Sequence, residues 1–201
     1  MDVPFDPERL RTDQATVLWK RGWGHLADRR GIYHAFPDYL ATIRPIPTVP
    51  DDVAARFPYP ILVDERVHAA DACTLLGIEH PFGNSPPEAW TVDLPSAHRP
   101  VGLVYWIRCA DPDQRLGLSL PETQARFQAD ETSLTLQQGL HWYAQHGFPF
   151  LHKRILACGG SANPGDQRRH PALLVNQDHR VRLFFTGQLS ARSKAWASRH
   201  V

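Results

Sequence analysis

Two proline-rich segments set the strongest limit on how this chain can fold. The first covers residues 44–60 and the second covers residues 78–100, and each contains five of the 18 prolines. Proline fixes φ and lacks the amide hydrogen that helices and central strands need, so neither segment can form a long regular element. We therefore predict a linker at about 44–60, after an N-terminal helical segment, and a second connection over 78–100.

The sequence around these connections carries both helical and strand patterns. Apolar spacing and capping residues predict helices over 7–22, 33–43 and 65–76, and helices that begin after Ser119 and Thr135. For the helix over 65–76, we expect Asp64 as the N-cap and Gly77 as the left-handed stop. Runs of apolar or alternating residues predict strands at 61–64, 101–109, 154–158, 171–175 and 181–185.

The order of these elements predicts an α+β fold. Helical patterns dominate the beginning of the chain and strand patterns dominate its end, instead of alternating regularly. We predict a mixed β-sheet with helices packed mainly on one face, N-terminal helices and a C-terminal run of strands. A chain of 201 residues with 42% apolar content can bury the core of one domain, so we expect a single domain over 1–201.

Several features favour a protein of the cytoplasm. The longest apolar run, Val101 to Ile107, is far shorter than the roughly 20 residues of a membrane-spanning helix, so no membrane partner is expected. The first residues lack the basic and apolar regions of a secretory signal. The three cysteines form no C-x-x-C pair, which predicts buried, reduced thiols. No motif requires a cofactor, and we expect none. The cysteines are Cys73, Cys109 and Cys158.

Charge is unevenly distributed along the chain. Residues 1–150 contain 13 Lys/Arg and 19 Asp/Glu, a balance of −6, whereas residues 151–201 contain nine Lys/Arg and two Asp, a balance of +7. Such asymmetry can mark a basic segment that binds an anion or nucleic acid. It can equally reflect internal pairing of a basic segment with an acidic part of the same protein. The second interpretation is favoured because the basic residues do not form a continuous block.

The glycine-rich loop after the predicted strand 154–158 is the most suggestive local feature. It has the G-x-x-x-x-G opening of a phosphate-binding loop, but Asp166 and Gln167 replace the Lys and Ser/Thr that such loops use to hold phosphate and magnesium. A nucleotide-hydrolysing loop is therefore not expected. Backbone amides and two arginines could still hold a carboxylate or phosphate. The alternative is a solvated turn. The predicted ligand-binding residues are Gly160, Ser161, Gly165, Arg168 and Arg169.

The histidine-rich segment 139–153 does not predict a metal site. In a helix that begins after Thr135 and ends at Gly147, His141 and His146 are five residues apart and lie about 140° apart around the axis. They cannot bind one ion from the same side, and we predict no metal ligands. Apolar residues of this helix form a stripe, so its aromatic side chains are expected to anchor it to the sheet.

Several short motifs resemble an uncharacterised bacterial family, largely actinobacterial, that is catalogued as a domain of unknown function. They are "VLWKRGWGHLA" at 17–27, "TLLGI" at 74–78, "LTLQQGLHWYAQHGFPFL" at 134–151, "LACGGS" at 156–161, "RHPALLV" at 169–175 and "WAS" at 196–198. The sequence departs from that family at 184–194, where the family tends to have tryptophans. The resemblance implies a single co-folding unit and carries no activity.

These observations favour a cytoplasmic binding protein whose small anionic ligand or protein partner contacts the basic C-terminal segment. Nucleic acid is a less favoured partner. One alternative is an enzyme with a histidine-containing pocket, built from distant residues such as His80, His98 and His152. The other alternative is a structural subunit of a larger assembly.

Overall fold

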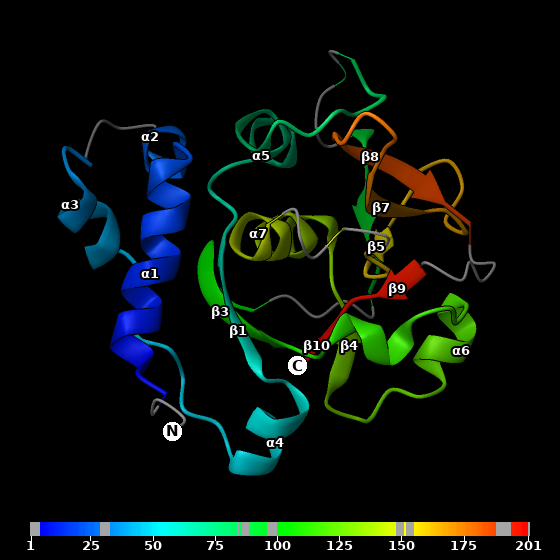
Figure 1. The fold of residues 1–201 in the computed structure, drawn as a ribbon, viewed down its shortest axis with the longest axis horizontal. Helices are drawn as coiled ribbons and strands as arrows, with labels where there is room; N and C mark the ends of the chain where they lie inside the picture. The colour runs from blue at the N-terminus through cyan, green and yellow to red at the C-terminus, as the bar shows by residue number, and fades with distance from the viewer. Residues whose placement is uncertain are drawn as a thin grey trace.

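The chain folds around two four-stranded sheets with helix α7 between them (Figure 1). A computed structural model describes residues 5–28, 33–83, 85, 89–95, 100–147, 151, 155–187 and 194–200. The helices are α1 (Pro7–Lys20), α2 (Trp23–Ala27), α3 (Phe36–Ala41), α4 (Asp51–Arg56), α5 (Ala69–Leu76), η2 (Pro112–Arg115), α6 (Leu120–Gln124) and α7 (Leu136–His146). The strands are β1 (Tyr59–Asp64), β2 (Val92–Asp93), β3 (Val104–Cys109), β4 (Glu131–Ser133), β5 (Ile155–Ala157), β6 (Ser161–Ala162), β7 (His170–Val175), β8 (Val181–Thr186), β9 (Lys194–Trp196) and β10 (Ser198–His200).

The α+β class predicted from the sequence is confirmed. The first sheet has the strand order β1-β3-β10-β4 and its pairs are antiparallel. The second has the order β8-β7-β5-β9 and is mixed, because β5 and β9 are parallel while its other pairs are antiparallel. Strands β9 and β10 are nearly consecutive but belong to different sheets, so the end of the chain connects the two sheets.

Local capping signals explain where several helices begin and end. Thr135 accepts a hydrogen bond from the Gln138 amide while the Gln138 side chain accepts one from the Thr135 amide, which completes the predicted capping box of α7. Ser119 caps α6 in the same way. Gly77 ends α5 with φ of 63°, a left-handed conformation that glycine adopts without a steric penalty.

The prediction for Asp64 as a helix cap was wrong. Helix α5 begins at Ala69 with His68 as its N-cap, and Asp64 instead ends strand β1. Its buried carboxylate accepts hydrogen bonds from Arg66 Nε at 2.8 Å, Arg66 Nη2 at 2.7 Å and Tyr39 Oη at 3.0 Å. A buried charge pair therefore replaces the local cap, because the carboxylate is carried into the interior by a strand.

The predicted linker at 44–60 contains more regular structure than expected. Helix α4 forms six residues within the linker, and the last two residues of the linker begin β1. The prolines still limit the length of each element, as Pro50 precedes α4 and Pro58 follows it. Among the described residues, no helix is long and apolar enough to span a bilayer.

Side chains from two helices satisfy the free edge of strand β1. Because β1 is the first strand of its sheet, the backbone groups on its outer side have no neighbour among the described strands. From α1, Gln14 donates from Nε2 to the Pro60 carbonyl at 2.6 Å and accepts from the Leu62 amide at 2.8 Å. From α7, Gln145 Nε2 donates to the Leu62 carbonyl at 2.8 Å. These bonds fix both helices against the sheet.

His141 completes this edge and explains the histidine-rich segment. Its Nδ1 lies 2.8 Å from the Gln137 carbonyl and its Nε2 lies 3.0 Å from the Asp64 amide. Both bonds form together only when the neutral ring carries its proton on Nδ1. The ring is completely buried, and burial lowers the pKa of His141, which favours this neutral form.

One hydrophobic cluster contains buried residues from Ala15 in α1 to Ala197 near the end of the chain. Trp23, Trp90, Trp142 and Trp196 are at most 1% exposed, so these four tryptophans supply much of the buried surface.

A close approach of α7 to the segment after β5 requires Gly139. A Cβ atom at this position would lie 2.2 Å from Cys158 Sγ.

Candidate functional site

A cavity of about 310 Å³ lies between the linker and the first sheet. Its position is set by the segment 46–49, by β1 and β3, and by β10. This volume is at the lower end of the range typical of small-molecule sites, roughly 300–1,000 Å³. Its apolar wall includes Ile46, Pro47, Val49, Pro60 and Trp106, and its polar residues are Arg108, Arg199 and His200.

Strand alternation places the cavity on a defined face of the sheet. Trp106 and Arg108 are two residues apart on β3 and therefore share a face. Pro60 of β1 is directly opposite Arg108 in the register, so it belongs to the same face. The Trp106 indole donates from Nε1 to the Arg44 carbonyl at 2.8 Å, which holds the start of the linker beside the sheet.

Arg199 is unusual among the residues around the cavity because it is a buried cation on the opposite face of the sheet from Trp106 and Arg108. It is only 2% exposed, and it is paired with Cys109 in the register between β10 and β3. Its Nε donates to Gln138 Oε1 at 3.2 Å and its Nη1 donates to the His200 carbonyl at 2.8 Å, so both acceptors are neutral. Its Nη2 is buried and has no hydrogen-bond partner among the described residues.

The environment of Arg199 is energetically unfavourable for a charge. Burial lowers the pKa of Arg199, and the nearby Tyr105, Cys109 and Glu65 partly oppose that effect. A buried charge normally has a charged or fully hydrogen-bonded partner, because the loss of hydration costs several kcal/mol. Because Arg199 is opposite Cys109, its guanidinium is on the face of the sheet that carries Tyr105 and Cys109, and its unused N–H does not face Trp106 and Arg108.

Arg108 supplies a second incompletely bonded guanidinium. Its Nε is buried without a hydrogen-bond partner among the described residues, and its Nη1 makes only a long 3.5 Å contact with the Phe57 carbonyl. The side chain is half-buried, and burial lowers the pKa of Arg108. Its Cζ lies 5.9 Å from the centre of the Phe5 ring, which is a weak cation–π contact.

His200 lies between the cavity and a pair of charged residues. Its Nε2 is 3.6 Å from Asp130 Oδ2, and Asp130 also forms a salt bridge with Arg56. The His200 ring packs edge-on against Phe57 with centroids 5.6 Å apart. A single carboxylate is thus already shared by two groups at this side of the cavity, while Arg108 and Arg199 retain unused donors.

The structure does not bring the five predicted ligand-binding residues into one site. Gly160 and Ser161 are buried, and their amides donate to the carbonyls of Leu134 and Cys158. Ser161 Oγ accepts from the Leu136 amide at 2.8 Å and donates to Asp93 at 2.6 Å. A Cβ atom on Gly160 would lie 2.7 Å from the Ser133 carbonyl oxygen. These two residues pack the interior, and their amides are already bonded.

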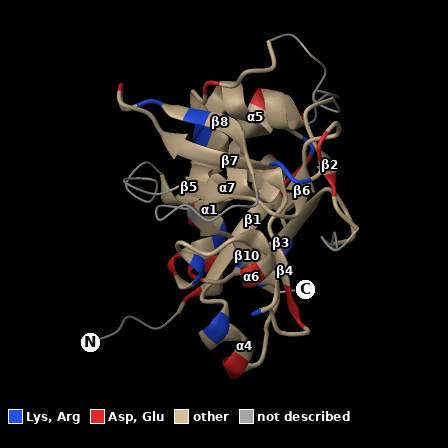
Figure 2. Cartoon of the chain, turned by 90° about the vertical axis from the view of Figure 1, so that its right-hand side faces the viewer, with Lys and Arg blue, Asp and Glu red and all other residues tan. Residues whose placement is uncertain are grey.

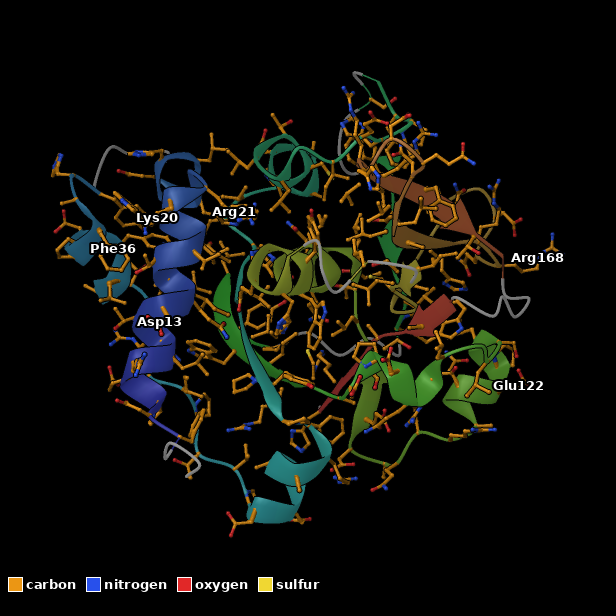
Figure 3. All side chains as sticks on the ribbon, in the orientation of Figure 1. Asp13, Lys20, Arg21, Phe36, Glu122 and Arg168 are labelled. Carbon is orange, nitrogen blue, oxygen red and sulfur yellow. The ribbon has the colours of Figure 1, made fainter. Side chains whose placement is uncertain are left out.

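The other half of the loop is an exposed turn. The Gly165 amide donates to Asn163 Oδ1, and the Arg168 and Arg169 amides donate to Asp166. The Arg168 side chain points away from the body of the molecule in Figure 3, and its Nε pairs with Asp166 at 3.1 Å. The backbone donors required for an anion site are already used within the turn, so the structure favours the solvated-turn alternative.

Part of the charge asymmetry is explained by internal pairing. Glu79 forms salt bridges with Arg180 at 3.1 Å and with Arg182 at 3.0 Å. Strand β8, which carries Arg182, has a blue basic segment in Figure 2. Arg199 is different, because its hydrogen bonds reach only neutral acceptors.

The histidines that the structure describes do not assemble a metal site of their own. His146 packs edge-on against Trp142 and Tyr59, and His80 lies against Trp90 with centroids 4.4 Å apart. His98 and His152 lie outside the described residues. Within the described part of the chain, no group of three or more His, Cys, Asp or Glu side chains could hold a metal ion.

Sequence reasoning missed Arg108, Arg199 and His200. The available signal was the arginine in the apolar strand "VYWIRC", on the same face as Trp106, and a second arginine directly after the closing "WAS". Neither signal identifies a cavity, since that depends on the pairing of β3 with β10.

Comparisons of the chain with protein-family models, with curated proteins and with solved structures found no match, so the family resemblance is still a prediction.

Proposed function

We propose that this protein binds a small anionic ligand in the cavity between the linker and the first sheet. The observation that carries the proposal is Arg108, which lines the cavity on the same face of β3 as Trp106 and whose buried Nε has no hydrogen-bond partner among the described residues. A ligand anion would neutralise charge that the protein has removed from water, and charge-assisted hydrogen bonds of this kind are stronger than neutral ones.

This proposal moves the site from the glycine-rich loop to the cavity beside β3 and keeps a contribution of the C-terminal segment through His200 of β10. Binding is favoured over catalysis because the described residues of the cavity wall include no serine, threonine, cysteine or carboxylate side chain. The histidine among them, His200, is 3.6 Å from Asp130 and has no nucleophile beside it in that part of the wall. The site has the parts needed to hold an anion, namely the Arg108 cation and an apolar enclosure.

Thermal unfolding in the presence of separate anions tests the proposal. Acetate, benzoate, phosphate and sulfate would be titrated against the wild type, Arg108→Gln and Arg182→Gln. A ligand of the native state at one hundred times its Kd adds about 2.7 kcal/mol to stability. We expect at least one anion to stabilise the wild type and Arg182→Gln but not Arg108→Gln.

The Arg182 variant is the matched control for charge. Arg182 is exposed, pairs with Glu79 and does not line the cavity, yet its replacement changes net charge by the same amount. It also controls for excluded salts such as sulfate, which stabilise proteins without occupying a site. Equal stabilisation of all three proteins, or of none, would reject the proposal.

A further inference from the structure

We infer that the proline-rich segment 44–50 is a docking surface for a partner protein, which binds one edge of the segment as a polyproline II ligand. The partner is a domain with an aromatic-lined groove for prolines and an acidic side chain for Arg44. The segment has the sequence "RPIPTVP" and connects α3 to α4 (Figure 1). This inference goes beyond the proposed function and does not depend on anion binding, although the segment also forms part of the cavity wall.

The sequence restricts the backbone of this segment to an extended conformation. Proline fixes φ at about −65°, and a residue that precedes proline is disfavoured in the helical region. Together these two rules restrict every residue of the segment except Thr48, because each of its three prolines follows a residue of the same segment. Pro50 has φ of −56° and ψ of 151°, which is close to the polyproline II conformation.

The hydrogen bonds and the burial of the segment are those of a polyproline II helix. The amides of residues 44–49 make no backbone hydrogen bond with any described residue, as expected for a helix without internal bonds. Burial repeats every three residues: Ile43 is buried, Ile46 and Val49 are half-buried, and the residues between them are exposed. Since a polyproline II helix has three residues per turn, this repeat places one edge against the body of the protein.

The same period places Arg44, Pro47 and Pro50 together on a second edge, and all three are exposed. The two prolines have the P-x-x-P spacing that aromatic-lined grooves bind. Arg44 lies one turn before Pro47, and no salt bridge joins it to another residue in the described part of the chain. A carboxylate at the end of the partner's groove can therefore form charge-assisted hydrogen bonds with its guanidinium.

The rest of the protein holds this edge in place before a partner binds. The Arg44 carbonyl accepts the 2.8 Å hydrogen bond from Trp106 Nε1, and Val49 packs against the hydrophobic cluster that contains Phe57. The first contact uses only the backbone of Arg44 and leaves its side chain at the surface. A segment that is already extended and anchored loses little conformational entropy on binding, which favours affinity.

Isothermal titration of the full chain with purified SH3 domains tests the inference. These domains are a class of aromatic-lined groove that binds P-x-x-P segments. A panel of them is first screened with a synthetic peptide of residues 42–52, so that each domain carried forward recognises this sequence. We expect the folded full chain to bind a domain that the peptide also binds.

Variants of the full chain locate the contact. Arg44→Glu and Pro47→Ala should each weaken binding by about tenfold or more, because they remove the charge and one proline of the bound edge. Arg126→Glu makes the same charge change at another exposed arginine, and Thr48→Ala changes an exposed residue that lies on neither of these two edges. Both controls should bind like the wild type. Thermal unfolding of each variant checks that it is folded.

Three results would overturn the inference. If the peptide binds no domain of the panel, the sequence is not a ligand of this class. If the peptide binds but the folded chain does not, the edge is covered in the native protein. If Arg44→Glu weakens binding no more than Arg126→Glu does, the contact lies elsewhere. The anion titrations use other ligands and depend on Arg108, so either conclusion can fail while the other stands.

Discussion

Replacement of Gln14 by methionine should strongly destabilise the fold, because it removes two hydrogen bonds at the free edge of β1. Gln14 is 8% exposed and bonds both the Pro60 carbonyl and the Leu62 amide. Methionine fills a similar volume but cannot bond either group. Each buried backbone group left unsatisfied costs about 1–3 kcal/mol, and the apolar gain of methionine offsets part of that cost. We expect a net loss of about 3 kcal/mol.

Two further glutamine variants turn this expectation into a graded test. Gln145→Met removes one bond to the same edge, at the Leu62 carbonyl, and should cost about half as much. Gln124→Met changes an exposed residue and should stay within about 0.5 kcal/mol.

Urea unfolding measures the three variants against the wild type, with the m-value checked for constancy. A loss at Gln14 that is no larger than the loss at Gln124 would show that water replaces the side chain at this edge, and would refute the argument.

Buried groups support three other predictions. Gly139→Ala should cost about 1–3 kcal/mol because its Cβ would meet Cys158 Sγ, and the double variant with Cys158→Ala should cost less than the sum of the single changes; additivity in urea unfolding would contradict this. Burial raises the pKa of Cys73 and of Cys158 to about 12, so both thiols should react with a thiol reagent at pH 8 only after unfolding, and rapid native-state modification would refute their burial. Burial lowers the pKa of His141 below its unfolded value of about 6.5, so the unfolded state binds the proton first and stability should fall as pH drops below about 6.5, by up to about 1.4 kcal/mol per pH unit; urea unfolding at pH 5 and 7 should show a smaller difference for His141→Gln than for the wild type.

Several element boundaries could be predicted from the sequence because the signals that set them are local. The capping boxes of Ser119 and Thr135 and the left-handed Gly77 each act over three to five residues, and all three formed as predicted. Buried cysteines and the strands β5, β7 and β8 were predictable for a similar reason, since apolar composition and period report burial directly.

The partners of charged residues could not be predicted in the same way. Asp64 has the sequence context of a helix cap, yet it pairs with Arg66 and Tyr39 in the interior. The glycine-rich loop has the composition of an anion site, yet its amides bond to carbonyls and side chains of the protein itself. Tyr39 in the first example and the Leu134 carbonyl in the second are tertiary partners that the local pattern could not specify.

The cavity residues show why some features of the protein follow from the sequence and others follow only from the tertiary structure. The sequence alone determined that Arg108 belongs to an apolar strand, because alternation with Tyr105, Ile107 and Cys109 is a property of neighbouring residues. Only the tertiary structure decided that β10 pairs with β3 and places Arg199, opposite Cys109, on the face of the sheet that Arg108 does not occupy. Backbone propensity and capping act within a few residues, whereas the hydration and partners of a charge depend on every chain segment that packs around it.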